Sequence, residues 1–91
     1  MTVAIVGVIP GGNAEMDQQM LQQIGVSPDS RPAGALARFA GPTEGGYRIV
    51  SLWESEEAWN TFQAERLDPY FEKAGRPMPP VEVWQVDTLM A

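Results

Sequence analysis

Hydrophobic and polar residues follow two periods along this chain, and together they predict four strands and two helices. Runs rich in β-branched residues indicate buried strands, whereas apolar residues spaced three and four apart indicate an amphipathic helix. The predicted strands cover residues 2–9, 34–40, 47–54 and 81–88. The predicted helices lie between Asn13 and Gly25, and from Ser55 to about Arg66 with a short continuation through Lys73. The element order is β-α-β-β-α-β.

The first predicted helix carries recognisable end signals. Asn13 can accept a hydrogen bond from the first turn, and acidic side chains suit the positive end of the helix dipole there: Glu15 and Asp17. Gly25 suits a left-handed ending, after which Val26 can pack back on Leu21. The following loop, residues 27–32, contains two prolines.

The second predicted helix begins at Ser55, a natural N-cap, with Glu56 and Glu57 in its first turn. Asp68 and Pro69 then resemble a second cap followed by proline at the first helical position. This pair predicts an interruption and a short restarted helix. Residues 75–80, which begin with glycine and contain three prolines, predict a stiff connector into the last strand.

The middle strands predict a hairpin whose faces can be read from the alternation. Residues 41–46 contain the breakers of a hairpin connection. In the strand before it, Leu36 and Arg38 share one face, and the other face carries Ala35, Ala37 and Phe39. In the strand after it, one face carries Tyr47, Ile49, Ser51 and Trp53.

This element order is that of the ferredoxin-like, split-βαβ α+β fold. Right-handed crossovers place both helices on one face of a four-stranded antiparallel sheet, within a single domain of residues 1–91. The other sheet face has no covering element, although three strands are apolar on both sides. Because soluble monomers avoid large apolar patches, we predict a homodimer with sheet facing sheet.

Composition narrows the function classes. The net charge is −6 without a cluster of Lys or Arg, which argues against nucleic acid and anionic membranes as partners. The absence of Cys and His removes thiolate nucleophiles, imidazole bases and the usual ligands of zinc or haem, so we expect no cofactor and no metal. No apolar run is long enough to span a bilayer, and no signal peptide is apparent, so we expect a cytoplasmic protein.

Residues 45–62 read GGYRIVSLWESEEAWNTF and contain two of the three tryptophans. This segment resembles the dimeric α+β barrel superfamily, in particular the antibiotic-biosynthesis-monooxygenase-like domains of actinobacteria. The matching residues are Gly46, Tyr47, Arg48, Val50, Trp53, Ser55, Glu57, Ala58, Trp59 and Phe62. Arg66-Leu67-x-Pro69 and the connector at 75–80 are also similar to that family.

The resemblance implies a barrel built from the sheets of two protomers, with a pocket between helices and sheet in each. Some members of the family oxidise aromatic polyketides without metal or flavin, and others degrade haem. Many of the enzymes carry a His about nine residues after the strand-end Trp. Here Phe62 stands in that place, which argues against haem chemistry and against His-dependent oxygenation.

Aromatic residues and methionines are the candidate wall of such a pocket. The large faces of Trp53 and Trp59 can stack on a flat ligand, with an indole N–H to orient it, although both also suit a core or a dimer interface. Phe62, Met16 and Met20 can complete the wall, although methionines at helical spacing are more often core residues.

Charged and phenolic residues supply the candidate polar contacts. Arg38 and Arg48 can bind a ligand oxyanion or pair with an acid such as Glu54. Tyr47 and Tyr70 can transfer a proton. The pattern identifies no catalytic residue.

Two functions from different classes therefore remain open. The first is a small-molecule-binding dimer that acts as a cofactor-independent monooxygenase on aromatic, polyketide-like compounds. The alternative is a non-catalytic ligand-binding or assembly protein on the same scaffold, which the missing His and Cys favour. Isomerase or cyclase chemistry by Tyr or Glu is a third option.

Overall fold

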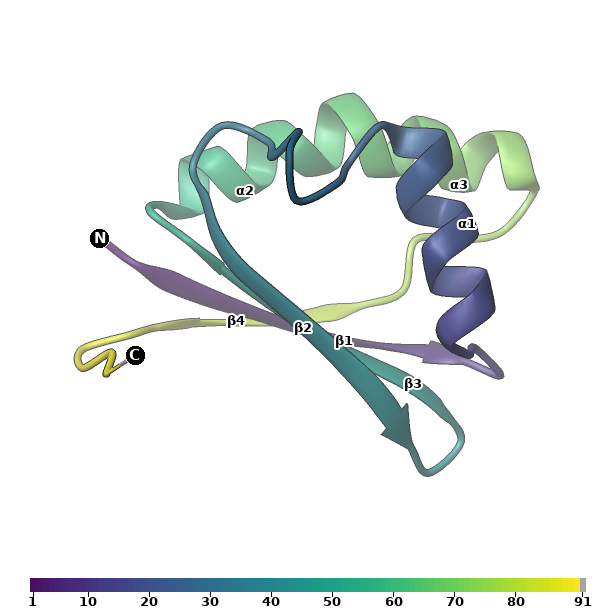
Figure 1. Ribbon diagram of the computed structural model, residues 1–91, viewed down its shortest axis with the longest axis horizontal. Helices are drawn as coiled ribbons and strands as arrows, with labels where there is room; N and C mark the ends of the chain where they lie inside the picture. Colours follow the sequence, from purple (N-terminus) through teal and green to yellow (C-terminus); the bar gives the residue numbers. More distant parts are fainter. Residues whose placement is uncertain (91) are drawn as a thin grey trace.

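The computed structural model describes residues 1–90 and confirms the predicted element order (Figure 1). The strands are β1 (Val3–Pro10), β2 (Ala35–Thr43), β3 (Gly46–Trp53) and β4 (Val81–Gln85). The helices are α1 (Ala14–Ile24), α2 (Glu56–Phe62), the π-helix η1 (Gln63–Leu67) and α3 (Asp68–Ala74).

The four strands form one antiparallel sheet in the order β2-β3-β1-β4. β1 and β3 are the central strands, and β2 and β4 form the edges. This is the strand order of the split-βαβ arrangement. Figure 1 shows α1 and the α2–α3 segment on the same side of the sheet, with no helix on the other side. The chain therefore has the ferredoxin-like α+β fold. We call the helix-covered side the inner face and the opposite side the outer face.

The ends of α1 follow the predicted signals. The side chain of Asn13 accepts a hydrogen bond from the backbone N–H of Met16 at 2.9 Å. At the other end, Gly25 has a φ of 74°, and the N–H of Val26 donates to the carbonyl of Leu21 at 2.9 Å. Arg66 of η1 also donates to the carbonyl of Ile24, which ties this end of α1 to the second helical segment.

The predicted interruption at Asp68 is wrong, because the second helical segment continues without a break. Ser55 caps α2 as expected, accepting from the N–H of Ala58 at 3.1 Å. Leu67 and Asp68 both keep right-handed helical dihedrals, so Asp68 lies inside the helix and does not cap a new one. A π-helical turn connects α2 to α3 instead, so that Pro69 is accommodated near the start of α3.

The hairpin is tighter than predicted, because β2 and β3 continue through most of residues 41–46. Thr43 pairs with Gly46, which leaves only Glu44 and Gly45 in the turn. Gly45 has a φ of 82°, which a glycine adopts readily. Gly46 also approaches β1 closely, and a Cβ there would overlap the carbonyl oxygen of Ile9.

A β-bulge between Ala35 and Ala37 changes the predicted faces of β2. Ala35 pairs with Trp53 and Arg38 pairs with Ser51, so Ala35 and Arg38 share the inner face. The alternation alone placed them on opposite faces. The extra residue shifts the pleat, as a bulge does, and it directs Arg38 toward the helices.

The core lies between the inner face and the helices. It joins Val3 and Ile5 of β1 and Trp53 of β3 to buried side chains from every helical segment: Met20, Ile24, Trp59, Leu67 and Phe71. β4 ends at Gln85, three residues earlier than predicted, although the N–H of Val86 still donates to Thr2 at 2.9 Å. Most of these core side chains also line the cavity described next.

Candidate functional site

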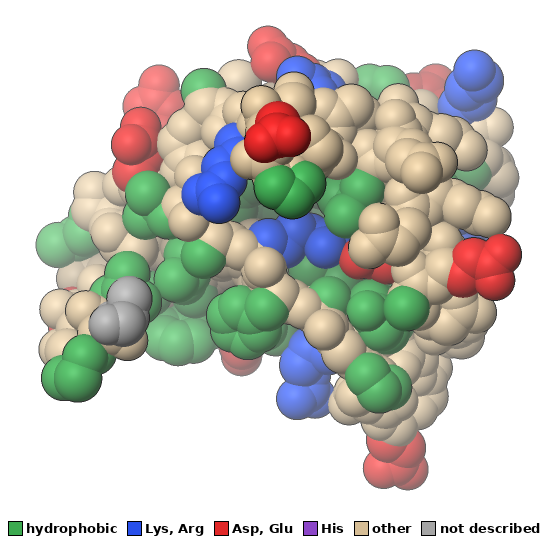
Figure 2. Space-filling model, viewed as in Figure 1, with side chains coloured by type: hydrophobic (Ala, Val, Ile, Leu, Met, Phe, Trp, Pro, Cys, Tyr) green, Lys and Arg blue, Asp and Glu red, His purple; other side chains and the backbone are tan. Residues whose placement is uncertain are grey.

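A cavity of about 580 Å³ lies between the inner sheet face and the helices. Its floor is formed by β1, β2 and β3, its sides by α1 and the second helical segment, and one rim by the loop of residues 26–32. Figure 2 shows the hollow, surrounded by hydrophobic side chains. A volume of this size is typical of sites that enclose a small organic molecule.

The aromatic wall of the cavity comes from the end of β3 and from α2. Trp53 lies 5.0 Å from Phe62 and 5.7 Å from Trp59, measured between ring centroids. The two indole rings meet edge to face at 63°. Both indoles are nearly buried, at 3% and 5% exposure, so they belong to the core and also line the cavity.

The indole N–H of Trp53 is already satisfied inside the protein. It donates to the hydroxyl of Ser51 at 2.9 Å, and Ser51 is itself buried. The inward alternation of β3 places these two side chains on the same face, two residues apart. Trp53 therefore contributes a small part of its ring to the cavity lining, and its N–H is engaged with Ser51.

The polar part of the cavity is a bidentate ion pair between Arg38 of β2 and Asp17 of α1. Arg38 donates to both carboxylate oxygens of Asp17, at 2.9 and 2.6 Å. The Asp17 side chain is 5% exposed and that of Arg38 is 28% exposed. Basic and acidic side chains are visible together within the hollow in Figure 2. Arg38 lines the cavity and Asp17 supports it from behind.

Five N–H groups of a guanidinium can donate, and the Asp17 carboxylate uses two of those of Arg38. The remaining donors lie at the border of an apolar cavity, where a ligand oxygen can accept them. The partner expected for Arg38 was an acid such as Glu54, and the structure shows Asp17 in that role instead.

The sequence pattern predicts Asp17 only as an acidic residue in the first turn of a helix, and so it does not indicate the buried ion pair. On α1 it lies three, four and seven residues before Met20, Leu21 and Ile24, which makes it part of the inward stripe. A carboxylate on an apolar helix face, together with an arginine within an apolar strand, was the signal for a buried pair.

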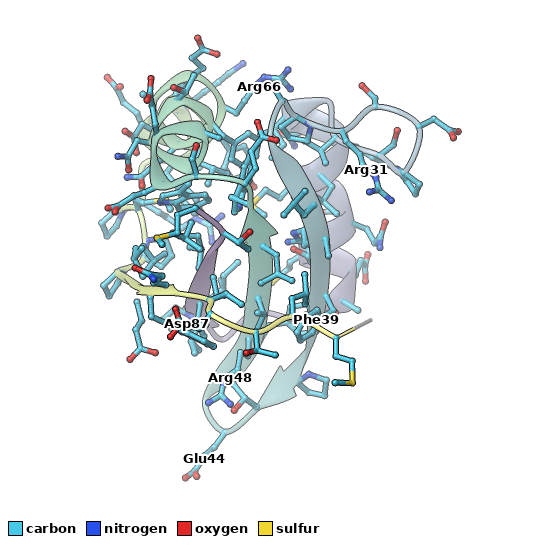
Figure 3. The ribbon with its side chains drawn as sticks, turned by 90° about the vertical axis from the view of Figure 1, so that its left-hand side faces the viewer. Arg31, Phe39, Glu44, Arg48, Arg66 and Asp87 are labelled. Atoms are coloured by element: carbon cyan, nitrogen blue, oxygen red, sulfur yellow. The ribbon has the colours of Figure 1, made fainter. Side chains whose placement is uncertain are left out.

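Arg31 is the second residue that the sequence pattern did not single out. It lies in the loop after α1 and lines the cavity rim, and it donates to the carbonyl of Leu36 at 3.4 Å. Figure 3 shows Arg31 on this loop, beside β2. The loop had been interpreted only as a connection, so its contribution to the cavity was not predicted.

The structure brings five of the seven predicted ligand-binding residues to the cavity: Arg38, Met20, Trp53, Trp59 and Phe62. Met16 and Tyr47 lie elsewhere, around a small hollow of about 80 Å³ between α1 and α3 that Tyr70 and Asp17 also line. Arg48 is exposed, and because the next residue, Ile49, lines the cavity, the alternation of β3 places Arg48 on the outer face. The roles of Met16, Tyr47 and Arg48 in ligand binding stay predictions.

Within residues 1–90, no group of three or more Asp or Glu side chains is arranged to hold a metal ion. None of the helices in this range is long and apolar enough to cross a bilayer.

No known protein family matches the sequence, and neither does any curated protein. Solved structures nevertheless share its fold. A mutant form of SnoaB, a cofactor-independent oxygenase from Streptomyces nogalater, superposes with a TM-score of 0.59 at 11% identity, covering 98% of this chain and 94% of its own. A protein proposed to be an antibiotic biosynthesis monooxygenase, from Deinococcus radiodurans, gives 0.58 at 12% identity, covering 100% and 97%.

A third structural neighbour is a mutant form of MhuD, which holds two manganese protoporphyrin IX molecules per active site. It gives a TM-score of 0.60 at 16% identity, with coverage of 100% of this chain and 99% of its own. These neighbours span almost the whole chain, so the likeness extends to the complete order of elements. The chain therefore shares its fold with these three structures, and at these identities the likeness is one of fold alone.

Proposed function

We propose that this protein binds a flat, largely apolar small molecule in the cavity and oxidises it with O₂ without a cofactor. The substrate class is an aromatic, polyketide-like compound that ionises to a phenolate or enolate. The observation that supports the proposal most is the cavity itself. Its volume is about 580 Å³, it has an aromatic wall, and the ion pair of Arg38 with Asp17 lies at its border. A core filled completely by Trp53, Trp59 and Phe62 would have left no room for such a ligand.

The supporting geometry combines one apolar surface with one polar group. The ring of Phe62, which is half-buried and lines the cavity, suits stacking on a polycyclic ligand, and Trp53 supports it from the core. The free N–H donors of Arg38 suit an anionic oxygen, and Asp17 holds the guanidinium in place through two hydrogen bonds. The cavity thus has the means to orient an aromatic ring and to stabilise negative charge on one of its oxygens.

The reaction follows from that charge. An anthrone-type substrate loses a proton to water and becomes an enolate, which transfers one electron to O₂. The resulting radical pair combines to form a C–O bond, and protonation gives a hydroperoxide. Loss of water then leaves a ketone. Overall, a CH₂ group and O₂ become C=O and H₂O, so the substrate supplies all the electrons. The protein contributes orientation and stabilisation of the enolate oxygen.

Oxygen uptake with anthrone tests this proposal. Arg38→Gln removes the charge that faces the enolate, and we expect the rate to fall by about 10²-fold, the lower range for losing an oxyanion-stabilising donor. Arg76→Gln is the matched control, because Arg76 lies outside the cavity lining, and it keeps the native rate. Uptake that stays at the uncatalysed rate with a panel of anthrones contradicts the enzymatic function.

A specific observation favours the second candidate, a non-catalytic binding protein. Among residues 1–90, the ionisable side chains that line the cavity are Arg31 and Arg38, and neither can act as a general base at neutral pH. A protein of this kind binds anthrone or its quinone product without consuming oxygen. Calorimetric binding together with a background rate of uptake identifies this function.

We further propose that the outer face is covered by the same face of a second copy. It carries exposed apolar side chains on both edge strands, among them Phe39 of β2 at 62% exposure and Trp84 of β4 at 50% exposure. Covering about 400–600 Å² of this surface per chain contributes on the order of 10 kcal/mol before the costs of association. Light scattering at micromolar concentration then gives the mass of two chains, and the mass of one chain refutes the proposal.

A further inference from the structure

We propose that the ligand carries a carboxylate, and that Arg31 at the cavity rim binds it. This inference rests on the proposed function, because it specifies the class of the aromatic ligand: an aromatic acid. It concerns a residue and a part of the cavity that the oxidation of an enolate does not use.

The ionisable side chains that line the cavity are basic, although the protein as a whole is acidic. The chain has twelve acidic and six basic residues, so a lining that followed the composition would be mainly acidic. Within residues 1–90, its ionisable side chains are instead two arginines, Arg31 and Arg38. Asp17 neutralises Arg38, but it lines the smaller hollow on the other side of the pair. The cavity therefore carries a net positive charge in a protein of net charge −6.

Most of the hydrogen-bond donors of Arg31 have no partner within the described residues. The part of the chain that the structure describes contains one ion pair, Arg38 with Asp17, so Arg31 has no carboxylate partner there. Its guanidinium makes one long hydrogen bond, to the carbonyl of Leu36 at 3.4 Å. Four further N–H donors remain, and the planar fork of a guanidinium matches the two oxygens of a carboxylate.

The position of Arg31 in its loop also suits contact with a ligand in the cavity. Arg31 lies between Pro28 and Pro32, in a loop that forms one rim of the cavity, and both prolines line the cavity as well. These rings restrict the loop backbone and so reduce the freedom that Arg31 loses on binding. In Figure 3 Arg31 lies on the same side of the molecule as β2, at the border of the helix layer. A ligand with its rings in the cavity can then direct a carboxylate toward solvent and Arg31.

Calorimetric titration with a matched pair of probes tests the inference. Anthracene carboxylate and the corresponding carboxamide have the same rings and differ in charge. We expect the native protein to bind the carboxylate about tenfold more tightly, which corresponds to about 1.4 kcal/mol. Arg31→Gln removes the guanidinium from an exposed loop position, so the fold persists. It abolishes this preference and leaves the affinity for the carboxamide unchanged, whereas Arg76→Gln, outside the cavity, retains the preference.

The outcomes separate this inference from the function on which it rests. Binding of both probes with equal affinity overturns the carboxylate assignment and leaves the aromatic site intact. A preference for the carboxylate that survives Arg31→Gln overturns the role of Arg31. Failure of the native protein to bind either probe overturns the proposed function and this inference together. The preference for the carboxylate also falls as salt is added, because the contact lies at an exposed rim.

Discussion

The ion pair between Arg38 and Asp17 allows a quantitative test of how the inner face is built. Arg38→Met removes the charge and keeps a long apolar side chain, which leaves the Asp17 carboxylate without its partner at 5% exposure. Asp17→Leu removes the acid and leaves the guanidinium unpaired. The double variant removes both charges and places two apolar side chains where they can pack together.

The magnitudes follow from the two exposures. Breaking a buried pair by removing one partner costs about 3–5 kcal/mol of folding free energy. Because the Arg38 side chain is 28% exposed, solvent screens part of this cost, and we expect about 3 kcal/mol for Arg38→Met. Asp17→Leu costs about 2 kcal/mol, because a long arginine side chain can move toward water. The double variant costs no more than about 2 kcal/mol, at least about 3 kcal/mol less than the sum, because replacing both partners of a buried pair by apolar side chains is often neutral or stabilising.

Urea unfolding at one fixed protein concentration measures these values. A loss of about 3 kcal/mol lowers the unfolding midpoint by roughly 1–3 M urea, given the dependence on urea expected for a small domain. Tryptophan fluorescence reports the transition directly, because Trp53 and Trp59 belong to the core. Two single variants that each cost less than about 1 kcal/mol, and whose effects add, would refute the buried-pair interpretation.

Two further predictions concern the sheet. Gly46→Ala lowers stability by at least about 2 kcal/mol, because the new Cβ overlaps the carbonyl of Ile9 in the paired strand. Gly41→Ala is the matched control and stays within about 1 kcal/mol of native in the same urea titration, since a Cβ there meets nothing within 4 Å; equal losses contradict the steric argument. On the outer face, Phe39→Ser combined with Trp84→Ser shifts the light-scattering mass from two chains toward one, because two large apolar contacts are lost. A mass that does not change shows that another surface forms the assembly.

The fold was predictable because each local signal agrees with the others. Asn13, Ser55 and Gly25 set the helix ends where the sequence predicts them, and these residues act through short-range contacts. The alternation in β3 correctly placed Ser51 and Trp53 on one face. Such features depend on neighbours close in sequence, so they can be read without knowledge of the tertiary structure.

The errors arose where the tertiary structure overrode local preferences. Asp68 and Pro69 resemble a helix start, but packing of Leu67 and Phe71 into the core keeps the helical segment continuous through a π-turn. The bulge at Leu36 has no strong local signal, yet it decides that Arg38 faces the helices. These two departures shape the cavity, because one positions α3 and the other brings the arginine inward.

For the candidate site, the sequence indicated the aromatic wall and half of the ion pair. Trp53, Trp59 and Phe62 stand out because they are large and concentrated in one short segment. Asp17 and Arg31 do not stand out, since an acid in the first turn and an arginine in a proline-containing loop are both common on protein surfaces. Only the packing of α1 and its following loop over the sheet brings Arg31 to the cavity rim and Asp17 to the Arg38 guanidinium.

If the cavity holds a flat aromatic molecule, a substitution that fills the cavity prevents binding. Ala35 lies on the inner face opposite Trp53 and lines the cavity, so Ala35→Phe occupies the space of the ligand. Ala64→Phe adds the same ring at an exposed position of η1, away from the cavity.

The measurement is a calorimetric titration of the three proteins with anthraquinone sulfonate, a water-soluble tricyclic probe. We expect the native protein and Ala64→Phe to bind one molecule per chain, and we expect Ala35→Phe to show no binding although it remains folded. Binding by Ala35→Phe with native affinity would place the ligand outside the cavity, and the absence of binding by the native protein would contradict the proposed binding outright.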